Sequence, residues 1–492
     1  MTFLHIAVAA SVAAGFLLAA RAVYLLIFHP LAKIPGPKLY ALTDFISLYY
    51  TVLGEWPAKL KTLHDIYGPT LRFGPNDVSS IAPETWKTVY GHKTQPDKTF
   101  EKDLTFYIES INGVDNIIRA DKDGHRRTRR VLAHAFSEKA LRGQEELLNN
   151  YTNLFISKIT DMAAAGENVD IMHWYNYITF DLIGDLAFGK PFGCLETGGY
   201  NPWVSMIFEA VRFGAIGQVV RRYPFLRKIQ HGLVPAKLAR SFAENRQLSQ
   251  RTAFERMDRG SIGRQDFMDY ILRHNDEKGL SKEEIAANAL VLIIAGSETT
   301  ATQLSGTTYY LLTNRDKYDK LVGEIRQRFS SEDEINMNSV NDLPYLLAVF
   351  NESFRMYPPV PIGLPRLAPA GGETVDGFYL PQNTSVSVPQ WSAYHCEQNW
   401  TDPERFVPER WLGTEPRYAN DQRDVLQPFS VGPRNCIGKN LAYAEMRLIL
   451  TRLLWRFDLE LLPESRNWNQ QRVFILWEKP NLMVKVTPVQ RS

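Results

Sequence analysis

Cysteine is scarce in this chain. Only Cys194, Cys396 and Cys436 occur among the 492 residues, and they lie far apart in the sequence. A small, odd number of distant cysteines is not a disulfide framework and is typical of a protein in a reducing compartment. It also excludes an iron–sulfur cluster held by this chain alone, since such clusters usually take several cysteine ligands.

The chain also has little net charge, and it lacks repeats and linkers. The 56 Lys and Arg residues nearly balance the 54 Asp and Glu residues, for a formal net charge of +2. Nothing therefore predicts a nucleic-acid partner. No repeat, low-complexity segment or Gly/Ser linker divides the sequence after residue 40. We therefore predict that residues 39–492 form one domain.

Charge is almost absent from the first 28 residues. Between Phe3 and Phe28 the only formal charge is Arg21, and about 20 apolar residues suffice to span a bilayer. Lys33 and Lys38 follow, so the positive-inside rule leaves the body in the cytosol. The alternative is a secretory signal peptide, which has a positive start and a shorter apolar core. We predict a membrane anchor over residues 1–28 and a stiff proline-rich hinge over residues 29–38.

Helical periodicity dominates the remaining sequence and predicts a mainly α protein with a minor β region. The predicted helices cover residues 141–164, 171–188, 202–218, 235–258, 281–313, 315–329, 342–356 and 439–455. Shorter β-like runs occur near residues 70–82, 373–380, 384–388 and 470–487.

One predicted helix, residues 281–313, is unusually apolar and then meets the polar run AGSETT at residues 295–300. Ser281 and Glu284 have the spacing of a capping box at its start. Inside a buried helix, the hydroxyl of Thr299 could donate to the carbonyl oxygen of Ala295 and open a groove. The alternative is a kinked structural helix with an exposed Glu298.

The segment PFSVGPRNCIG, residues 428–438, places Cys436 just before an amphipathic helix. The positive end of a helix favours a thiolate over a thiol, and the small neighbours allow a bulky planar ligand to approach. With Arg434 as an anion partner, this pattern suits a haem iron bound by cysteine, with an arginine on a propionate. A buried structural cysteine and a nucleophilic cysteine are the alternatives.

Several motifs together resemble those of the cytochrome P450 family. AGSETT resembles the oxygen-binding-helix motif, and residues 406–411, FVPERW, resemble the Phe-x-Pro-Glu-Arg-Phe/Trp segment. Glu352 and Arg355 resemble the Glu-x-x-Arg motif. The haem-binding signature Phe-x-x-Gly-x-Arg-x-Cys-x-Gly is matched by Phe429, Gly432, Arg434, Cys436 and Gly438. The resemblance covers essentially the whole chain and is to membrane-anchored fungal secondary-metabolism members, of the trichothecene C-15 hydroxylase type.

The resemblance implies the P450 fold, with haem between the long central helix and the cysteine loop, and Cys436 as axial ligand. It implies a buried structural triad of Glu352, Arg355 and Arg410, with Arg405 as the rival third member. Without it, Glu352 and Arg355 would be read as a surface ion pair.

The resemblance also assigns haem propionates to His125, Arg129 and Arg366. His125 and Arg129 lie within the basic run GHRRTRR, residues 124–130. Read without the family, this run is a solvated helix face. Its other arginines, Arg126, Arg127 and Arg130, would help to dock an acidic electron donor.

The implied activity is monooxygenation (EC 1.14), with haem b as the cofactor. Electrons would come from NADPH through a separate P450 reductase, with cytochrome b5 as a further candidate donor. Thr299 and Glu298 are the predicted catalytic pair, which would deliver protons. The alternatives are a P450-fold enzyme that closes rings, desaturates or isomerises, and a non-catalytic haem sensor or carrier.

The implied location is the endoplasmic reticulum membrane. The implied substrate is a lipophilic terpenoid or polyketide intermediate, as in a fungal mycotoxin pathway. By family position, the candidate substrate contacts are apolar: Phe100, Phe106, Phe208, Ala295, Ile362 and Phe474. Each of these aromatic residues could equally belong to the plain core.

Overall fold

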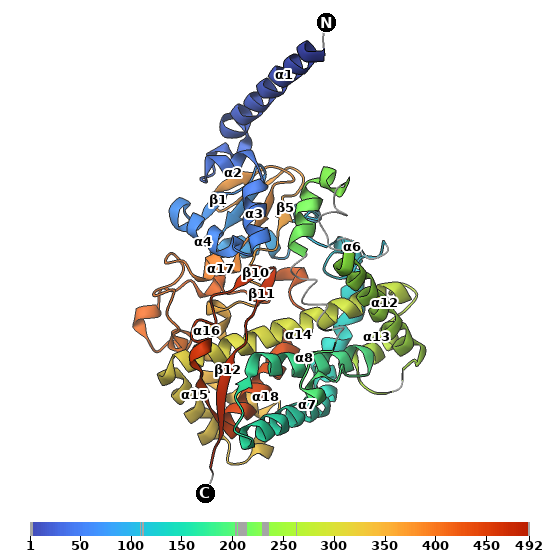
Figure 1. Cartoon of the computed structure of the whole chain (residues 1–492), viewed down its shortest axis with the longest axis vertical. Coiled ribbons are helices and arrows are strands. Elements are labelled where there is room, and N and C mark those ends of the chain that lie inside the picture. Colours follow the sequence, from blue (N-terminus) through green and yellow to red (C-terminus); the bar gives the residue numbers. More distant parts are fainter. Residues whose placement is uncertain are drawn as a thin grey trace. The chain divides into compact units, whose positions relative to one another are not determined.

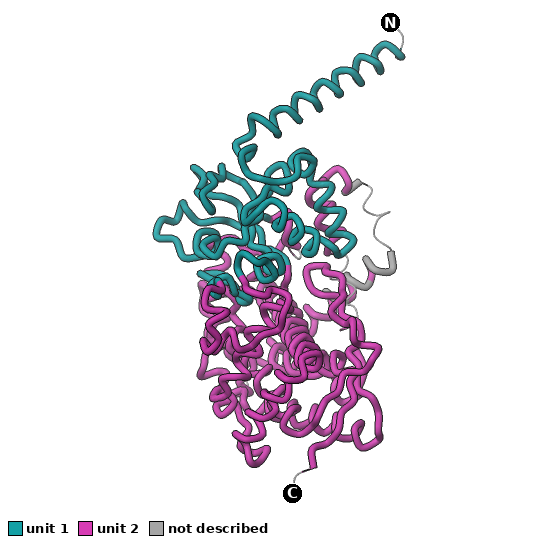
Figure 2. The backbone as a smooth tube through the Cα atoms, turned by 90° about the vertical axis from the view of Figure 1, so that its left-hand side faces the viewer, with its two compact units in different colours: residues 1–103, 362–399, 422–434 teal, residues 104–361, 400–421, 435–492 magenta. Residues whose placement is uncertain are grey.

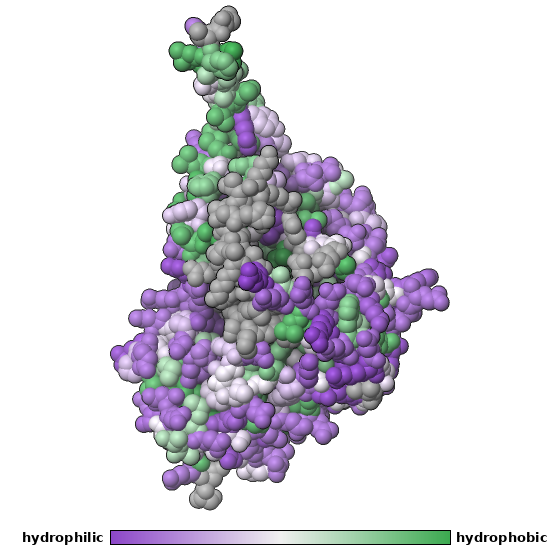
Figure 3. All heavy atoms as spheres, turned by 45° about the vertical axis from the view of Figure 1, so that its right-hand side comes forward, coloured by the Kyte–Doolittle hydropathy of each residue, from purple (hydrophilic) through white to green (hydrophobic). Residues whose placement is uncertain are grey.

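The computed structural model describes residues 3–108, 110, 113–201, 204, 214–228, 236–261 and 263–490. The chain begins with helix α1 (Phe3–Val23) and one π-helical turn (Tyr24–Phe28). Together they are long and apolar enough to cross a membrane, and no residue of α1 is buried. Figure 3 shows this helix as a largely hydrophobic surface. A short turn (Pro30–Lys33) follows within the predicted hinge.

The chain divides into two compact units that are interleaved along the sequence (Figure 2). Unit 1 contains residues 1–103, 362–399 and 422–434. Unit 2 contains residues 104–361, 400–421 and 435–492.

Unit 1 contains a five-stranded sheet with the order β1-β2-β8-β5-β3. Only the β2–β8 pair is parallel. The strands are β1 (Thr70–Arg72), β2 (Asp77–Ser80), β3 (Glu101–Lys102), β5 (Arg366–Leu367) and β8 (Ser385–Ser387), and β6 (Glu373–Val375) and β7 (Phe378–Leu380) form a hairpin. The helices are α2 (Lys38–Leu42), α3 (Phe45–Leu53), α4 (Trp56–Tyr67), α5 (Pro83–Thr85) and α17 (Gln390–Tyr394). Leu60 and Leu63 of α4 pack with Tyr40 and Leu71 into one buried cluster.

Unit 2 is mainly helical (Figure 1). Its helices are α6 (Lys122–Leu132), α7 (Glu138–Ala164), α8 (Ile171–Phe188), α9 (Cys194–Thr197), α12 (Ala236–Asp258), α13 (Phe267–His274), α14 (Lys282–Thr313), α15 (Arg315–Arg328), α16 (Pro344–Met356) and α18 (Lys439–Arg456). A three-stranded sheet has the order β4 (Val169–Asp170), β12 (Met483–Pro488), β9 (Phe457–Leu461), and β10 (Arg472–Phe474) pairs with β11 (Leu476–Glu478). The predicted class, mainly α with a minor β region, is confirmed.

Helix α14 is the centre of unit 2, and α8, α12, α15, α16 and α18 all contact it. The predicted capping box is present, with the Ser281 hydroxyl accepting from the Glu284 amide and the Glu284 carboxylate accepting from the Ser281 amide. α14 packs closely on α8, because a Cβ at Gly296 would lie only 2.7 Å from Cδ1 of Ile183. α14 therefore holds the AGSETT motif rigidly within a close-packed interior.

Candidate functional site

Cys436 lies three residues before α18, in unit 2. Its residue surface is open, yet protein atoms crowd round the sulfur. Burial therefore raises the pKa of the thiol above its ordinary value, although the Gly438 amide and the positive charge of Arg129 act in the opposite direction. The expectation of a thiolate at this position stays a prediction.

Arg129 on α6 is bound to the residue that precedes the cysteine. Its two terminal nitrogens donate to the backbone oxygen and to the side-chain oxygen of Asn435, each at 2.6 Å. His125 lies one turn earlier on α6 and is buried. Arg129 thereby fixes the cysteine loop in addition to any ligand that it binds.

The two signature glycines have different structural reasons. Gly432 has φ +75°, and a Cβ there would overlap the carbonyl oxygen of Tyr90, so unit 1 itself requires a glycine. At Gly438 a Cβ would meet only Phe136, at an ordinary 3.8 Å. Packing within the described chain does not require Gly438, which therefore leaves room for a group that approaches the backbone. Phe429 is partly buried in unit 1.

A buried cluster of cations lies in unit 1. Arg366 and Lys102 occupy paired positions on β5 and β3, where their like charges oppose each other. Burial lowers the pKa of Lys102 well below its ordinary value, and the charges of Arg366 and Arg434 lower it further. Arg434 forms an ion pair with Glu101, at 3.9 Å. Sequence reasoning missed Lys102, because only the pairing of β3 with β5 brings it to Arg366.

This cation cluster fits a ligand that carries carboxylates. Arg366 is buried, and its Nε has no hydrogen-bond partner within the described ranges. Buried like charges are stable only when an anion compensates them. The donor set thus suits haem propionates.

Helix α14 is mostly buried, but in its middle residues 290–291, 294–296 and 299 are only partly covered or exposed. Val291 and Thr299 are half-buried and Ala295 between them is exposed, whereas Glu298 and Thr300 are buried. Val291, Ala295 and Thr299 are spaced four apart, so they share one helix face. The hydroxyl of Thr299 donates to the carbonyl oxygen of Ala295 at 2.6 Å, which confirms the predicted bond.

Glu298 and its neighbour Thr299 have different partners: Glu298 contacts Lys479, whereas Thr299 contacts the carbonyl oxygen of Ala295. Its carboxylate forms an ion pair with Lys479, and both side chains are only 3% exposed. Lys479 Nζ also donates to Thr302 Oγ1 at 2.7 Å. Sequence reasoning missed Lys479, which lies 181 residues away along the chain. The reading of Glu298 as an exposed residue of a kinked helix is excluded by its burial.

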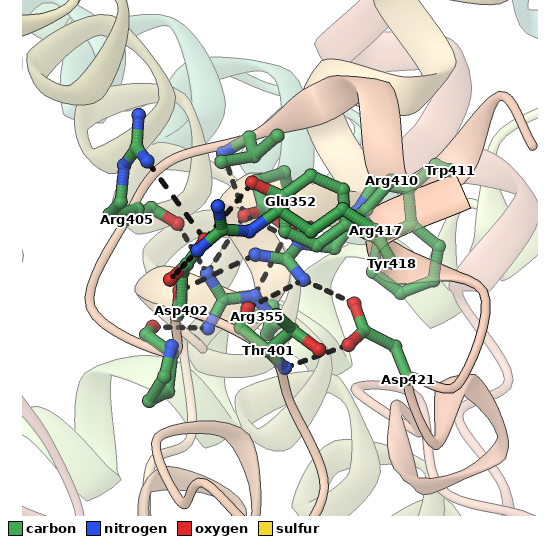
Figure 4. Close-up of polar contacts among 12 residues, drawn as sticks. Glu352, Arg355, Thr401, Asp402, Arg405, Arg410, Trp411, Arg417, Tyr418 and Asp421 are labelled. Atoms are coloured by element: carbon green, nitrogen blue, oxygen red, sulfur yellow. Dashed lines mark hydrogen bonds and ion pairs between the residues drawn. The ribbon is translucent and has the colours of Figure 1, made fainter. Parts of the chain in front are cut away.

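The predicted structural residues Glu352, Arg355 and Arg410 meet in unit 2 with no side-chain exposure (Figure 4). Arg355 donates to both carboxylate oxygens of Glu352, at 3.0 and 2.8 Å, and Arg410 Nε donates to Oε1 at 3.1 Å. Burial alone would raise the pKa of Glu352, but the two guanidinium groups hold it below its ordinary value. A surface ion pair is therefore excluded.

Arg405, the rival third member, is distinguished from Arg410 by its contacts. Its side chain is mostly exposed and lies 3.9 Å from Asp402. Only its carbonyl oxygen joins the group, by accepting from Arg355 at 2.8 Å. Trp411 completes the set by donating from its indole nitrogen to Glu352 Oε2 at 2.9 Å. The role of this group in supporting the cysteine loop stays a prediction.

The predicted substrate contacts have mixed surroundings. Phe100 in unit 1 and Phe474 in unit 2 are buried, which favours a core role, whereas Phe106 and Ile362 are half-buried. Ala295 is the exposed member of the set. Phe208 lies outside the described residues.

The basic run on α6 carries less unbalanced charge than the sequence indicated. Arg127 binds the carboxylate of Glu284, and Arg130 binds Asp276 at 2.9 and 2.8 Å. These acidic partners are distant in the sequence, so no local sequence pattern predicts the ion pairs. The role of Arg126, Arg127 and Arg130 in docking an electron donor stays a prediction.

Comparison with known proteins gives a consistent answer. The sequence matches the cytochrome P450 family over residues 39–486. Cytochrome P450 monooxygenase aclL of Aspergillus oryzae is 46% identical over 473 residues, 96% of each chain. Cytochrome P450 monooxygenase astA of Talaromyces wortmannii is 43% identical over 462 residues, 94% of this chain and 93% of the relative. Trichothecene C-4 hydroxylase of Trichoderma arundinaceum is 42% identical over 475 residues, 95% of this chain and 94% of the relative.

These matches confirm the resemblance to fungal secondary-metabolism P450s, with a trichothecene hydroxylase specific for C-4 among the relatives. The relatives are similar over nearly their whole length, and several are named as monooxygenases. The chain therefore belongs to the cytochrome P450 family and is a P450 monooxygenase, whose cofactor is haem.

Proposed function

We propose that this enzyme inserts one oxygen atom of O2 into a lipophilic secondary metabolite, by hydroxylation or epoxidation. The second oxygen atom becomes water, and the reaction takes up two electrons from NADPH and two protons from solvent (about one NADPH per product). A separate P450 reductase passes the electrons, with cytochrome b5 as a further candidate donor. The membrane is that of the endoplasmic reticulum, with the catalytic body in the cytosol.

The observation that carries the proposal is the open stripe on α14, Val291, Ala295 and Thr299, in the same unit as Cys436. An apolar, partly open helix face with one hydroxyl suits a lipophilic substrate and a proton donor. Haem bound through a cysteine thiolate supplies the chemistry that cleaves O2.

The residues have separate proposed roles. Cys436 ligates the iron, and the Gly438 amide, which donates to its sulfur, tunes that ligand. His125, Arg129, Arg366 and Arg434 are assigned to the propionates by the family resemblance. Lys102 joins this set because its charge is set against those of Arg366 and Arg434.

Proton delivery is the proposed role of Thr299 and Glu298. A hydroxyl and a carboxyl near the reacting oxygen can relay protons through water. Their presence favours a monooxygenase over an isomerase, which needs no protons from a relay.

The substrate class follows from the relatives and from the apolar candidates Phe106, Ala295 and Ile362. One relative is named Trichothecene C-4 hydroxylase. We propose a terpenoid or polyketide intermediate for this chain also.

The test is co-expression of the full-length protein with a P450 reductase and the neighbouring biosynthetic enzymes, under isotopically labelled O2. One labelled oxygen atom in a new product supports the proposal. Cys436→Ser should abolish both the product and the thiolate-type carbon monoxide spectrum. Cys396→Ser, at a buried free cysteine, is the matched control and should keep both. An unlabelled product would instead indicate a rearrangement or desaturation.

A further inference from the structure

The segment after the β10–β11 hairpin is joined to α14 by one side chain. Lys479 follows β11 directly and reaches Glu298 and Thr302, which lie one turn apart on the same face of α14. Thr302 Oγ1 in turn lies 3.4 Å from Glu298 Oε1. Three polar groups of α14 and of the C-terminal segment are therefore clustered where almost no solvent reaches.

The ammonium of Lys479 is the cation that compensates Glu298. The second oxygen, Glu298 Oε2, is buried and has no hydrogen-bond partner within the described ranges. Burial raises the pKa of Tyr200 and of Tyr357, and the negative charge of Glu298 raises both further. Without Lys479, the described residues would offer this buried carboxylate no compensating cation, and an uncompensated buried charge is strongly destabilising.

The ion pair also determines where Glu298 points. Adjacent residues of an α-helix are turned about 100° from one another. Thr299 lies on the open stripe with Ala295, whereas Glu298 is held among buried groups next to Thr302. In this arrangement the carboxylate faces away from the hydroxyl that it is proposed to serve.

We propose that Lys479 is the positioning residue for Glu298. Its ammonium holds the carboxylate beside Thr302, and the carboxylate must leave Lys479 before it carries a proton toward Thr299. Each proton that Glu298 gives up is replaced by one from solvent, so the carboxylate returns to Lys479 unchanged. This inference rests on the proposed function, in which Glu298 and Thr299 deliver protons.

A first experiment needs no substrate and uses the haem-loaded full-length protein. In Lys479→Met we expect the Glu298 carboxylate to lose its ammonium partner, seen as a shifted carboxylate band in the infrared difference spectrum. That band should be missing from Lys479→Met/Glu298→Gln and from Lys479→Arg, which keeps the cation. Lys485→Met, at an exposed lysine on β12, is the matched control. A Lys479→Met protein without the band would overturn the inference.

A second experiment measures product formed per NADPH consumed, with the substrate found by the product analysis above. Lys479→Met and Glu298→Gln should each lower this ratio by at least about tenfold. The double variant should lose no more than Glu298→Gln alone, because the two residues act as a unit. Additive losses, or unchanged coupling in Lys479→Met, would contradict the inference. Failure of the proposed function is distinguishable, because then the wild-type protein itself forms no oxygenated product, while the infrared result still judges Lys479.

Discussion

At the scale of single residues, Lys102 lies close to two other cations, Arg366 and Arg434. A haem propionate at this position would explain the arrangement. Two guanidinium groups depress its pKa beyond the effect of burial. An anion that binds Arg366 and Arg434 would offset the repulsion between these arginines and Lys102. The cluster therefore favours the haem-loaded state.

Replacing Lys102 should therefore act in opposite directions on the two states. We expect Lys102→Met to stabilise the haem-free protein by about 1 kcal/mol, since a like-charge contact is removed. It should also speed haem loss by about tenfold, equivalent to about 1.4 kcal/mol. Chemical unfolding of the haem-free protein and transfer of haem to an acceptor protein measure the two effects. Lys98→Met, at a half-exposed lysine on the same segment, is the control. Loss of stability in both states would indicate a purely structural lysine.

Substitutions at the two signature glycines, Gly432 and Gly438, should likewise affect the haem-free and haem-loaded states differently. Gly432→Ala should destabilise the haem-free protein by about 3 kcal/mol, because an alanine there needs a left-handed backbone and overlaps Tyr90. Gly438→Ala should leave that stability nearly unchanged and should lower haem content, since only a bound group would meet its methyl. Haem content and unfolding midpoints of the two variants check this contrast. Equal destabilisation by both alanines would contradict it.

How far single residues could be predicted depends on their sequence neighbourhood. Cys436, Glu352 and Arg410 were found through local motifs, because their spacing carries the pattern. Lys479 and Lys102 were missed, because their partners are distant in the sequence. Lys479 meets Glu298 only through the placement of the segment after β11, and Lys102 meets Arg366 only through the pairing of β3 with β5. The burial that raises the pKa of Cys436 could not be predicted, because a helix start can be read from sequence whereas burial cannot.

At the scale of elements, α14 and α18 share a buried carboxyl group. Glu445 on α18 is only 3% exposed, and burial raises its pKa to about 8, offset in part by a hydrogen bond with Thr300 of α14. The folded protein therefore keeps a proton that the unfolded chain releases from about pH 4.5 upward. The resulting stability is complete below that pH and is lost as the pH rises to about 8.

Glu445→Gln should remove this pH dependence. Relative to its value near pH 5, the wild-type unfolding free energy should fall by up to about 5 kcal/mol near pH 9, and the variant should be flatter. Denaturant titrations at both pH values measure the difference. Glu415→Gln, at an exposed residue, should behave like the wild type. An equally steep pH dependence in Glu445→Gln would show that another group is responsible.

Long helices were the most predictable elements. The predicted helices at 281–313 and 439–455 match α14 and α18 within one or two residues, because a long periodic pattern and a capping box mark them. α4 and α6 are missing from the predicted helices because both are short, although the basic run within α6 predicts a solvated helix face. The predicted helix at 202–218 lies largely outside the described residues.

At the scale of the whole molecule, the N-terminal helix is a candidate membrane anchor. Removing residues 1–28 should shift most of the protein from the membrane to the soluble fraction, since α1 and the turn after it supply the span. Fractionation after a high-salt wash measures the shift. The haem spectrum of the soluble form is the control for folding. Persistent membrane binding would instead implicate exposed apolar residues of α3, such as Phe45 and Tyr49.

The cytosolic orientation makes a separate prediction about glycosylation. Acceptor sequences occur at Asn150, Asn351, Asn383 and Asn399, and Asn150 and Asn383 are exposed. On the predicted topology none of them meets the glycosylation machinery. Glycosidase treatment should therefore leave the gel mobility unchanged, whereas a shift would reverse the topology.

The apolar character of α14 has a consequence for biosynthesis at the membrane. By length and composition this helix could itself cross a bilayer, although two thirds of its apolar window is buried in unit 2 (67%). During synthesis at the translocation channel, two segments are therefore apolar enough for insertion into the membrane: Phe3–Phe28 and α14. Helix α8, its most extensive partner, is synthesised more than 90 residues earlier (Phe188 to Lys282) and can cover it at once. We therefore expect chain order to favour the packing of α14 on α8 over its insertion into lipid.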